Sequence, residues 1–268
     1  MKNKLYSLIF LSFLFFSNSF AQNGIVNYGF IEALFTGNAL GEDCNAVLKF
    51  NKNNIAYVST KTSLEKPEDI NVKKTFAKPD DSGGTISMGM QVSVNGSQVI
   101  IDKKQNIMLS NSIPLAMSIF FLKEEIPIFD WKISNKETKK IGKFDCTKAT
   151  TTFRGRNYTA WFAKAIPVPY GPWKLGGLPG LILEAYDTNK NVYWYFKSIE
   201  YPAPNVQVET KIFNKKIEEQ KEFITLKEYA KKQTEYVIKV NENGMMAAKQ
   251  FNLTAQETAI QETFIEIF

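Results

Sequence analysis

The sequence predicts a mainly β protein, in which a curved antiparallel sheet or an incomplete barrel packs against one or two helices. Three observations support this fold class. Apolar residues alternate with polar ones over strand lengths, most clearly in residues 86–94. Short turn signals, rich in Asn, Gly and charged residues, separate these runs. A clear helical pattern appears only after Pro202 and Pro204, which mark a change in character.

The expected strands are short and are joined mostly by hairpin turns. The first strand is expected at residues 24–35, and an Asn-rich turn joins the next two, at 46–50 and 55–58. Further strands are expected at 86–94, 99–101, 107–109, 126–133 and 140–151, the last two separated by a charged turn at 135–139. Two hairpins follow, one within 153–162 with its tip at 154–157 and one formed by 181–186 with 192–199. Residues 59–84 are expected to form a long surface loop. The apolar run 113–122 is expected to be a buried strand or a short helix.

Near the end of the sequence, Thr225 and Glu228 have the spacing of a capping box, which predicts a helix start. Apolar residues at helical spacing continue to Val240, and Asn243-Gly244 is the expected end. We therefore divide the chain into a signal peptide (residues 1–21), a β domain (22–204) and an extension with an amphipathic helix (205–268).

Residues 1–21 have the pattern of a secretory signal. Lys2 and Lys4 precede the apolar run 5–16, and Ser19 and Ala21 occupy the cleavage-determining positions before Gln22. The sequence thus predicts a periplasmic, secreted or outer-membrane-associated protein. The later apolar run 113–122 is too short for a transmembrane helix, so no membrane span is expected after signal cleavage.

Composition excludes several chemistries. The chain has no histidine, which excludes Ser-His-Asp and Cys-His catalysis and His-ligated zinc. We expect no metal and no cofactor. Without Lys2 and Lys4, 31 basic and 27 acidic residues leave a net charge of +4, and no Arg-rich stripe occurs, so nucleic acid is not an expected partner.

The two cysteines, Cys44 and Cys146, are a candidate disulfide because the predicted export signal leads to an oxidising compartment. The alternative is a pair of buried thiols. An even cysteine count does not decide between them.

The stretch 160–184 organises the chain. An aromatic strand enters a loop dense in Gly and Pro, and an apolar strand leaves it. The prolines fix φ, while the glycines allow positive φ or close approach of the backbone. The loop is also apolar, so we expect it to fold onto the core, either as a plug at one end of the β structure or as the lip of a binding site. We expect six residues of this loop to have a structural role: Gly171, Pro172, Gly177, Leu178, Pro179 and Gly180.

This stretch resembles the GLPGLI family of exported Bacteroidetes proteins. The residues that carry the resemblance are Gly155-Arg156, Ala160-Trp161-Phe162, Ile166-Pro167, Gly171-Pro172, Gly177-Leu178-Pro179-Gly180-Leu181-Ile182 and, upstream, Trp131-Lys132-Ile133, Gly142 and Cys146. The resemblance implies an envelope protein without an established activity, in a family whose members look like accessories beside outer-membrane transporters.

Two functions remain open. Aromatic residues in and after the motif favour a non-enzymatic protein that binds an apolar or peptide-like ligand or an outer-membrane partner, through Trp161, Trp173, Leu178, Tyr193 and Trp194. The alternative is a hydrolase that acts on glycans with paired carboxylates, whose candidates are Glu32, Asp102, Asp130, Asp145, Glu184 and Asp187. No spacing selects a pair, so no catalytic residue is assigned. Arg154 and Arg156 have two interpretations: they hold a carboxylate or a phosphate, or they lie at a turn exposed to water, which is the favoured expectation.

Overall fold

The computed structural model describes residues 23–32, 42–66, 92–111, 119–209, 222–252 and 264–268, together with residues 213, 215, 219, 254, 255, 257 and 259. The predicted signal peptide lies outside this set, as do residues 86–91 of the predicted strand and residues 113–118 of the apolar run. The described residues 92–94 do not form a strand. Ser93 makes an isolated bridge with Lys61, and Val94 is exposed.

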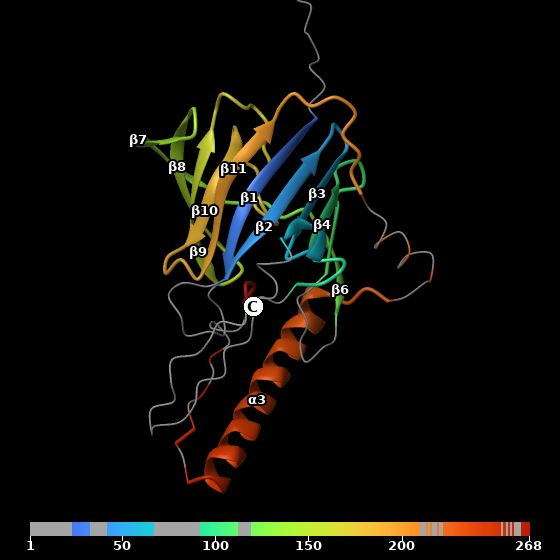
Figure 1. Cartoon of the computed structure of the whole chain (residues 1–268), viewed down its shortest axis with the longest axis vertical. Helices are drawn as coiled ribbons and strands as arrows, with labels where there is room; N and C mark the ends of the chain where they lie inside the picture. The colour runs from blue at the N-terminus through green and yellow to red at the C-terminus, as the bar shows by residue number, and fades with distance from the viewer. Residues whose placement is uncertain are drawn as a thin grey trace, which may run out of the picture.

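Within the described residues, eleven strands form one antiparallel sheet, whose arrangement Figure 1 shows, and this confirms the predicted fold class. In chain order they are β1 (Gly24–Glu32), β2 (Glu42–Phe50), β3 (Asn54–Ser59), β4 (Ser97–Asp102), β5 (Ile107–Asn111), β6 (Phe121–Glu125), β7 (Lys132–Ile141), β8 (Phe144–Phe153), β9 (Arg156–Ala163), β10 (Leu181–Asp187) and β11 (Val192–Glu200). A short 3-10 turn, η1 (Thr62–Leu64), follows β3, and one long helix is α3 (Leu226–Gln250).

The sheet consists of two meanders that meet in the middle. Its strand order is β6-β5-β4-β3-β2-β1-β11-β10-β9-β8-β7, so β1 pairs with β11 and the chain passes from one edge, β6, directly to the other, β7. In a flat sheet, edges ten strand spacings apart would be roughly 48 Å from each other. The connection of residues 126–131 reaches only about 24 Å when extended. The sheet therefore curls, and its inner face encloses the core.

The inner face carries the largest buried side chains. Trp194 of β11 is completely buried and stacks on Phe30 of β1, with ring centroids 5.3 Å apart. Its indole N–H donates to the Tyr57 hydroxyl at 2.8 Å, which satisfies two buried polar groups at once. Residues that lie opposite each other on adjacent antiparallel strands face the same side of the sheet. Trp194 lies opposite Phe30 on β1 and opposite Ala185 on β10, so all three belong to the inner face.

Most predicted hairpins are confirmed. The Asn51 side chain accepts hydrogen bonds from the backbone N–H groups of Asn53 and Asn54 (2.9 and 2.8 Å), which forms the turn between β2 and β3. Gly155 has φ +70° at the tip between β8 and β9. Asn-Gly at residues 95–96 leads into β4, and residues 187–191 join β10 to β11.

The predicted charged turn at residues 135–139 is wrong, because these residues lie within β7. The chain turns instead at Gly142, whose φ of +56° is costly for other residues. A register shift between Ser134 and Thr138 accommodates the charged run in the strand. β7 is an edge strand and largely exposed, and charges are common on such strands because they oppose pairing with other chains.

The helix α3 begins as predicted and ends later. Thr225 and Glu228 form both hydrogen bonds of the capping box. The helix continues through Gly244 to Gln250, since the residues after this glycine include alanines and methionines that favour helix. Its first turns pack on the β6 edge, where Leu122, Tyr229 and Phe264 form a small apolar cluster. Among the described residues, no helix has the length and apolar content to cross a lipid bilayer.

The predicted disulfide is wrong, because Cys44 and Cys146 are not joined to each other. Cys44 lies opposite Phe30, on the inner face of β2. Cys146 of β8 shares the opposite, outer face with Lys148, and four strands separate β8 from β2. A disulfide requires Cα atoms within about 7 Å and converging side chains, and neither condition holds across the sheet. Burial raises the pKa of the Cys146 thiol to about 11, which keeps it protonated and unreactive at neutral pH.

Candidate functional site

The motif loop, residues 164–180, fills the inside of the curled sheet. The backbone N–H groups of Leu181 and Ile182 donate to the carbonyls of Ile166 and Tyr170 at 3.0 and 2.9 Å, which folds the loop back on its own exit strand. The Trp131 indole, just before β7, donates to the Gly176 carbonyl at 2.8 Å. The loop therefore has the role of a plug, one of the two interpretations that the sequence left open.

Three of the five predicted binding residues belong to the core. Trp173, Leu178 and Trp194 are all buried on the inner face, where the rings of Trp173 and Trp194 stack with centroids 5.7 Å apart. Trp173 has φ +54°, an uncommon conformation for a bulky residue, and packing against Phe153 and Tyr158 holds it there. These side chains have their partners inside the protein, where they stabilise the fold.

Two glycines of the motif serve different purposes. A Cβ added at Gly180 would lie 2.4 Å from the Ala163 carbonyl oxygen, whereas at Gly177 it would meet nothing closer than 4.0 Å. Gly177 instead has φ +85°.

We expect Gly180→Ala to lower the free energy of unfolding by about 1–3 kcal/mol, because the backbone of β9 must shift. Gly177→Ala should cost about 1 kcal/mol through its left-handed backbone alone. Urea denaturation measures both. Gly244→Ala is the matched control, since this helical glycine has open space around it and the change should stabilise by about 0.5–1 kcal/mol. An unchanged midpoint for Gly180→Ala would contradict the close approach.

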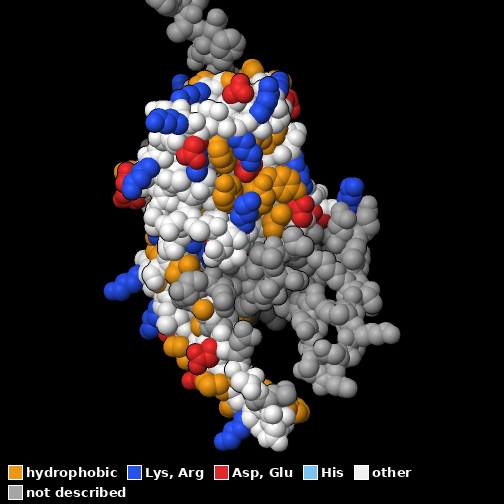
Figure 2. All heavy atoms as spheres, turned by 90° about the vertical axis from the view of Figure 1, so that its left-hand side faces the viewer, with side chains coloured by type: hydrophobic (Ala, Val, Ile, Leu, Met, Phe, Trp, Pro, Cys, Tyr) orange, Lys and Arg blue, Asp and Glu red, His pale blue; other side chains and the backbone are white. Residues whose placement is uncertain are grey.

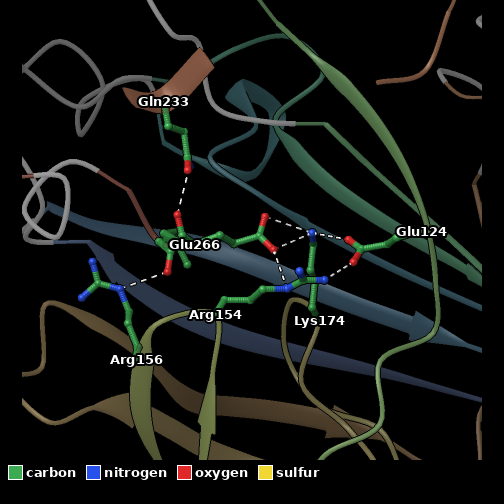
Figure 3. A network of polar contacts seen from close by, with 7 residues as sticks. Glu124, Arg154, Arg156, Lys174, Gln233 and Glu266 are labelled. Atoms are coloured by element: carbon green, nitrogen blue, oxygen red, sulfur yellow. Dashed lines mark hydrogen bonds and ion pairs between the residues drawn. The ribbon is translucent and has the colours of Figure 1, made fainter. Parts of the chain in front are cut away.

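Lys174 of the motif loop lies at the centre of an ion cluster inside the protein (Figure 3). Its ammonium is 2.6 Å from a Glu124 carboxylate oxygen and 2.8 Å from a Glu266 carboxylate oxygen. The Arg154 guanidinium contacts both carboxylates as well, through its terminal nitrogen to Glu124 and through Nε to Glu266 at 3.5 Å. We call Glu124, Arg154, Lys174 and Glu266 the inner ion cluster. Its two cations and two anions balance, and the Lys174 side chain is 1% exposed.

The inner ion cluster joins four parts of the chain that are distant in sequence. Glu124 lies on β6, Arg154 at the turn before β9, Lys174 in the motif loop and Glu266 in the segment 264–268. Sequence reasoning missed Lys174. It favoured a turn exposed to water for Arg154, which is wrong for this largely buried side chain, over the alternative of a carboxylate contact, which Arg154 makes with Glu124 and Glu266. The available signal was a single charged residue between Trp173 and Leu175 in an otherwise apolar loop, since a buried charge requires partners.

Arg156 anchors the same region. Its guanidinium pairs with Asp187 at 2.8 Å and donates to the backbone carbonyls of Phe264 and Ile265, at 2.6 and 3.0 Å. The side chain is 6% exposed, so the expected exposure to water is wrong here too. Asp187 also accepts the N–H of Val192 and so fixes the start of β11. Asp187 therefore stabilises the fold at two points, and Arg156 connects β9 to the segment 264–268.

The other two predicted binding residues, Trp161 and Tyr193, lie on the outer face. Trp161 is half-buried and its indole N–H is 3.5 Å from the Tyr186 hydroxyl. Tyr186 contacts Tyr193 edge to face with ring centroids 5.8 Å apart, and Tyr193 lies 5.6 Å from Tyr195. We call Trp161, Tyr186, Tyr193 and Tyr195 the outer aromatic surface. It runs across β9, β10 and β11, which are adjacent in the sheet.

Tyr195 reaches across β1. Its ring lies directly over Gly29, where an added Cβ would be 2.0 Å from the ring, and its hydroxyl donates to Asp43 at 2.6 Å. Because Gly29 has no side chain, the Tyr195 ring can lie directly against the backbone of β1. Burial, followed by nearby Glu184 and Tyr186, raises the pKa of Tyr193 to about 12, so its hydroxyl remains a neutral donor at physiological pH.

Lysines surround the outer aromatic surface. Lys139 lies over the Trp161 ring, Lys190 over the rings of Tyr186 and Tyr193, and Lys197 over the Tyr195 ring. Their ammonium groups are 5.2–5.8 Å from the ring centroids, within the range of cation–π contacts. Figure 2, which views the side of the sheet that carries β7 and β8, shows hydrophobic side chains gathered among lysines and acidic residues. This surface combines apolar rings with hydrogen-bond donors, a composition typical of protein interfaces.

Five of the six predicted carboxylates have structural partners or are exposed to water. Glu184 is bound by Lys139 at 2.7 Å on the outer face, and Asp187 is bound by Arg156 on the inner face. Asp102 accepts backbone N–H groups in the turn after β4. Asp130 and Asp145 are exposed. Each of these groups has a structural partner or lies in water.

Glu32, at the end of β1, differs from the other carboxylates. Burial raises its pKa from the ordinary value of 4.5 to about 7, although the Arg156 charge opposes this shift. Since the folded protein holds the proton more tightly than the unfolded chain, the stabilising contribution is complete below pH 4.5 and is lost as the pH rises through about 7.

We therefore expect the free energy of unfolding to fall between pH 4.5 and 7, and Glu32→Gln to flatten this fall. Urea denaturation across that pH range measures both slopes. Glu200→Gln, at an exposed position on β11, is the control and should keep the slope of the unmodified protein. Equal slopes for Glu32→Gln and the unmodified protein would show that Glu32 titrates normally.

A family model described as a protein of unknown function (Porph_ging) matches residues 152–184, which contain Arg154, Trp161, Lys174 and the whole motif loop. Two solved structures, described as PNGF-II in the P21 and C2 space groups, each share 16% sequence identity with a TM-score of 0.45. The match covers 76% of this chain in both cases, but only 31% and 30% of the two PNGF-II chains. No curated protein matches the chain.

Proposed function

We propose that this protein is a non-enzymatic binding protein of the cell envelope, and that its outer aromatic surface contacts another envelope protein. The observation that supports this is the continuous row of Trp161, Tyr186, Tyr193 and Tyr195, half-buried on the outer face and lacking a covering element among the described residues. Tyr and Trp contribute apolar area and hydrogen bonds at little cost in side-chain entropy, so they are enriched in protein interfaces.

The shape of the surface favours a macromolecular partner over a small apolar ligand. Small ligands bind in concave sites that cover most of their surface. The outer face belongs to the outside of a curled sheet, whereas the aromatic residues of the inside already stack on one another. A shallow groove of about 220 Å³ lies between Phe120 and α3, and none of the predicted binding residues lines it.

The location in the envelope rests on the predicted signal of residues 1–21 and on the resemblance of residues 177–182 to the GLPGLI motif. The match of residues 152–184 to a family of unknown function is compatible with this and adds no activity. An outer-membrane protein is the partner class that the resemblance suggests.

The test compares affinity capture from envelope extracts by the unmodified protein and by Trp161→Ala/Tyr193→Ala. We expect the double variant to lose at least about 90% of one enriched protein, because central aromatic residues dominate binding energy. Ile128→Ala is the matched control, since Ile128 is a fully accessible apolar residue outside this surface. Circular dichroism establishes that each variant is folded. Equal capture by the folded double variant and the unmodified protein would refute the proposal.

Glu32 is the one observation that favours the alternative, a hydrolase of glycans, since a raised carboxyl pKa is typical of a general acid. A glycosidase also needs a second, facing carboxyl group. The purified protein should therefore be assayed on envelope glycans with Glu32→Gln alongside. Hydrolysis that disappears in this variant would replace the binding proposal with the enzymatic one.

A further inference from the structure

The segment 264–268, Phe-Ile-Glu-Ile-Phe, is held much as a bound peptide would be. Arg156 donates to the carbonyls of Phe264 and Ile265, and the Gln233 amide of α3 donates to the carbonyl of Glu266 at 2.9 Å. The N–H of Ile267 donates to the Arg154 carbonyl at 3.0 Å. Most of these contacts involve the backbone, so they would suit other extended peptides equally well.

One side chain of the segment has a specific receptor. The Glu266 carboxylate lies between Lys174 and Arg154, and Lys174 contacts both of its oxygens, at 2.8 and 3.0 Å (Figure 3). If Glu266 left, two cations would face the single carboxylate of Glu124. The vacated site would then carry a net positive charge in a buried position, which strongly favours a carboxylate as its occupant.

Apolar contacts flank this charge. Phe264 packs against Tyr236 of α3, with ring centroids 6.2 Å apart, and Phe268 lies edge to face with Tyr229 at 6.3 Å. Before the segment, the described residues Glu257 and Ala259 are exposed. The segment is therefore seated between apolar contacts at both ends and a buried cationic position in the middle.

We propose that Lys174, Arg154, Arg156 and Gln233 form a peptide-binding site that takes an extended acidic peptide from another protein, with one carboxylate between flanking apolar residues, and that the segment 264–268 is its internal competitor. This site lies between the motif loop and α3, and the proposal does not depend on the outer aromatic surface. A tethered segment has an effective concentration near the millimolar range, so it would exclude all but strong or abundant peptides until it is displaced.

The experiment uses the full chain and a fluorescein-labelled Phe-Ile-Glu-Ile-Phe peptide, followed by fluorescence anisotropy. Glu266→Lys places an ammonium beside Lys174 and Arg154 and should expel the segment. We expect this variant to bind the peptide at least tenfold more tightly than the unmodified protein does. A peptide with Gln in place of Glu should bind at least tenfold more weakly than the Glu peptide, because its amide leaves the cations unpaired. Glu257→Lys, the same charge change at an exposed position, should behave as the unmodified protein.

Circular dichroism and thermal melting establish that the variants are folded. If Glu266→Lys does not fold, Glu266→Gln decides the question, because it weakens the hold on the segment without adding a charge. Failure of the folded variant to bind the Glu peptide more tightly than the unmodified protein would overturn the proposal. Equal binding of the Glu and Gln peptides would overturn it too, since the cationic position would then recognise nothing.

Discussion

Lys174→Ala is expected to lower the free energy of unfolding by about 3–5 kcal/mol, because it leaves an uncompensated charge inside the protein. The ammonium of Lys174 touches Glu124 and Glu266, and Arg154 alone would remain to balance both carboxylates. The loss should therefore far exceed that of an ordinary surface lysine. Urea denaturation followed by circular dichroism measures it.

Lys164→Ala is the matched control, because Lys164 belongs to the same loop and is exposed. Its effect should stay within about 0.5 kcal/mol. The double variant Lys174→Ala/Glu266→Gln removes one charge of each sign from the inner ion cluster, so it should be less destabilised than Lys174→Ala alone. A similar small effect for Lys174→Ala and Lys164→Ala would mean that the cluster is solvated rather than buried.

Trp194→Ala is expected to cost a comparable amount, about 3–5 kcal/mol, because it creates a large cavity in the core. The indole is completely buried between the rings of Phe30 and Trp173, and its removal also takes the hydrogen-bond donor from the Tyr57 hydroxyl. The left-handed backbone of Trp173 would lose part of the packing that holds it. The midpoint and slope of urea denaturation give the change in stability.

Tyr193→Ala is the control for Trp194→Ala, because it removes an aromatic side chain from the other face of the same strand. Tyr193 precedes Trp194 on β11, but it is half-buried on the outer face. Its removal leaves no enclosed cavity, so we expect a loss of about 1 kcal/mol or less. If the two variants were equally destabilised, the division of β11 into a core face and an outer face would be wrong.

Much of the local structure follows from residues close together in sequence. Asn51 forms the turn before β3 with its own side chain, Gly155 supplies the positive φ between β8 and β9, and Thr225 with Glu228 caps α3. Each of these signals acts within about four residues, so the sequence alone predicts the element. The errors are also local in kind: a charged edge strand resembled a turn at residues 135–139, and Gly244 did not end its helix.

The candidate site was only partly predictable. The sequence singled out the motif loop and its aromatic neighbours, but it did not separate Trp161 and Tyr193, on the outer face, from Trp173 and Trp194, in the core. Which face a strand residue takes depends on the register of the whole sheet, and a shift of one residue reverses every side chain. A register shift does occur in β10, next to Glu184.

The sequence by itself therefore determined most hairpins, the helix start and the apolar character of the motif loop, because backbone preference and hydrophobic periodicity are properties of short segments. Only the tertiary structure decided that β1 lies beside β11, that Cys44 and Cys146 lie on opposite faces, and that Lys174 meets Glu124 and Glu266. These contacts join residues far apart in sequence. They form because the curled sheet must bury one entire face, and burial then requires a partner for every charge inside it.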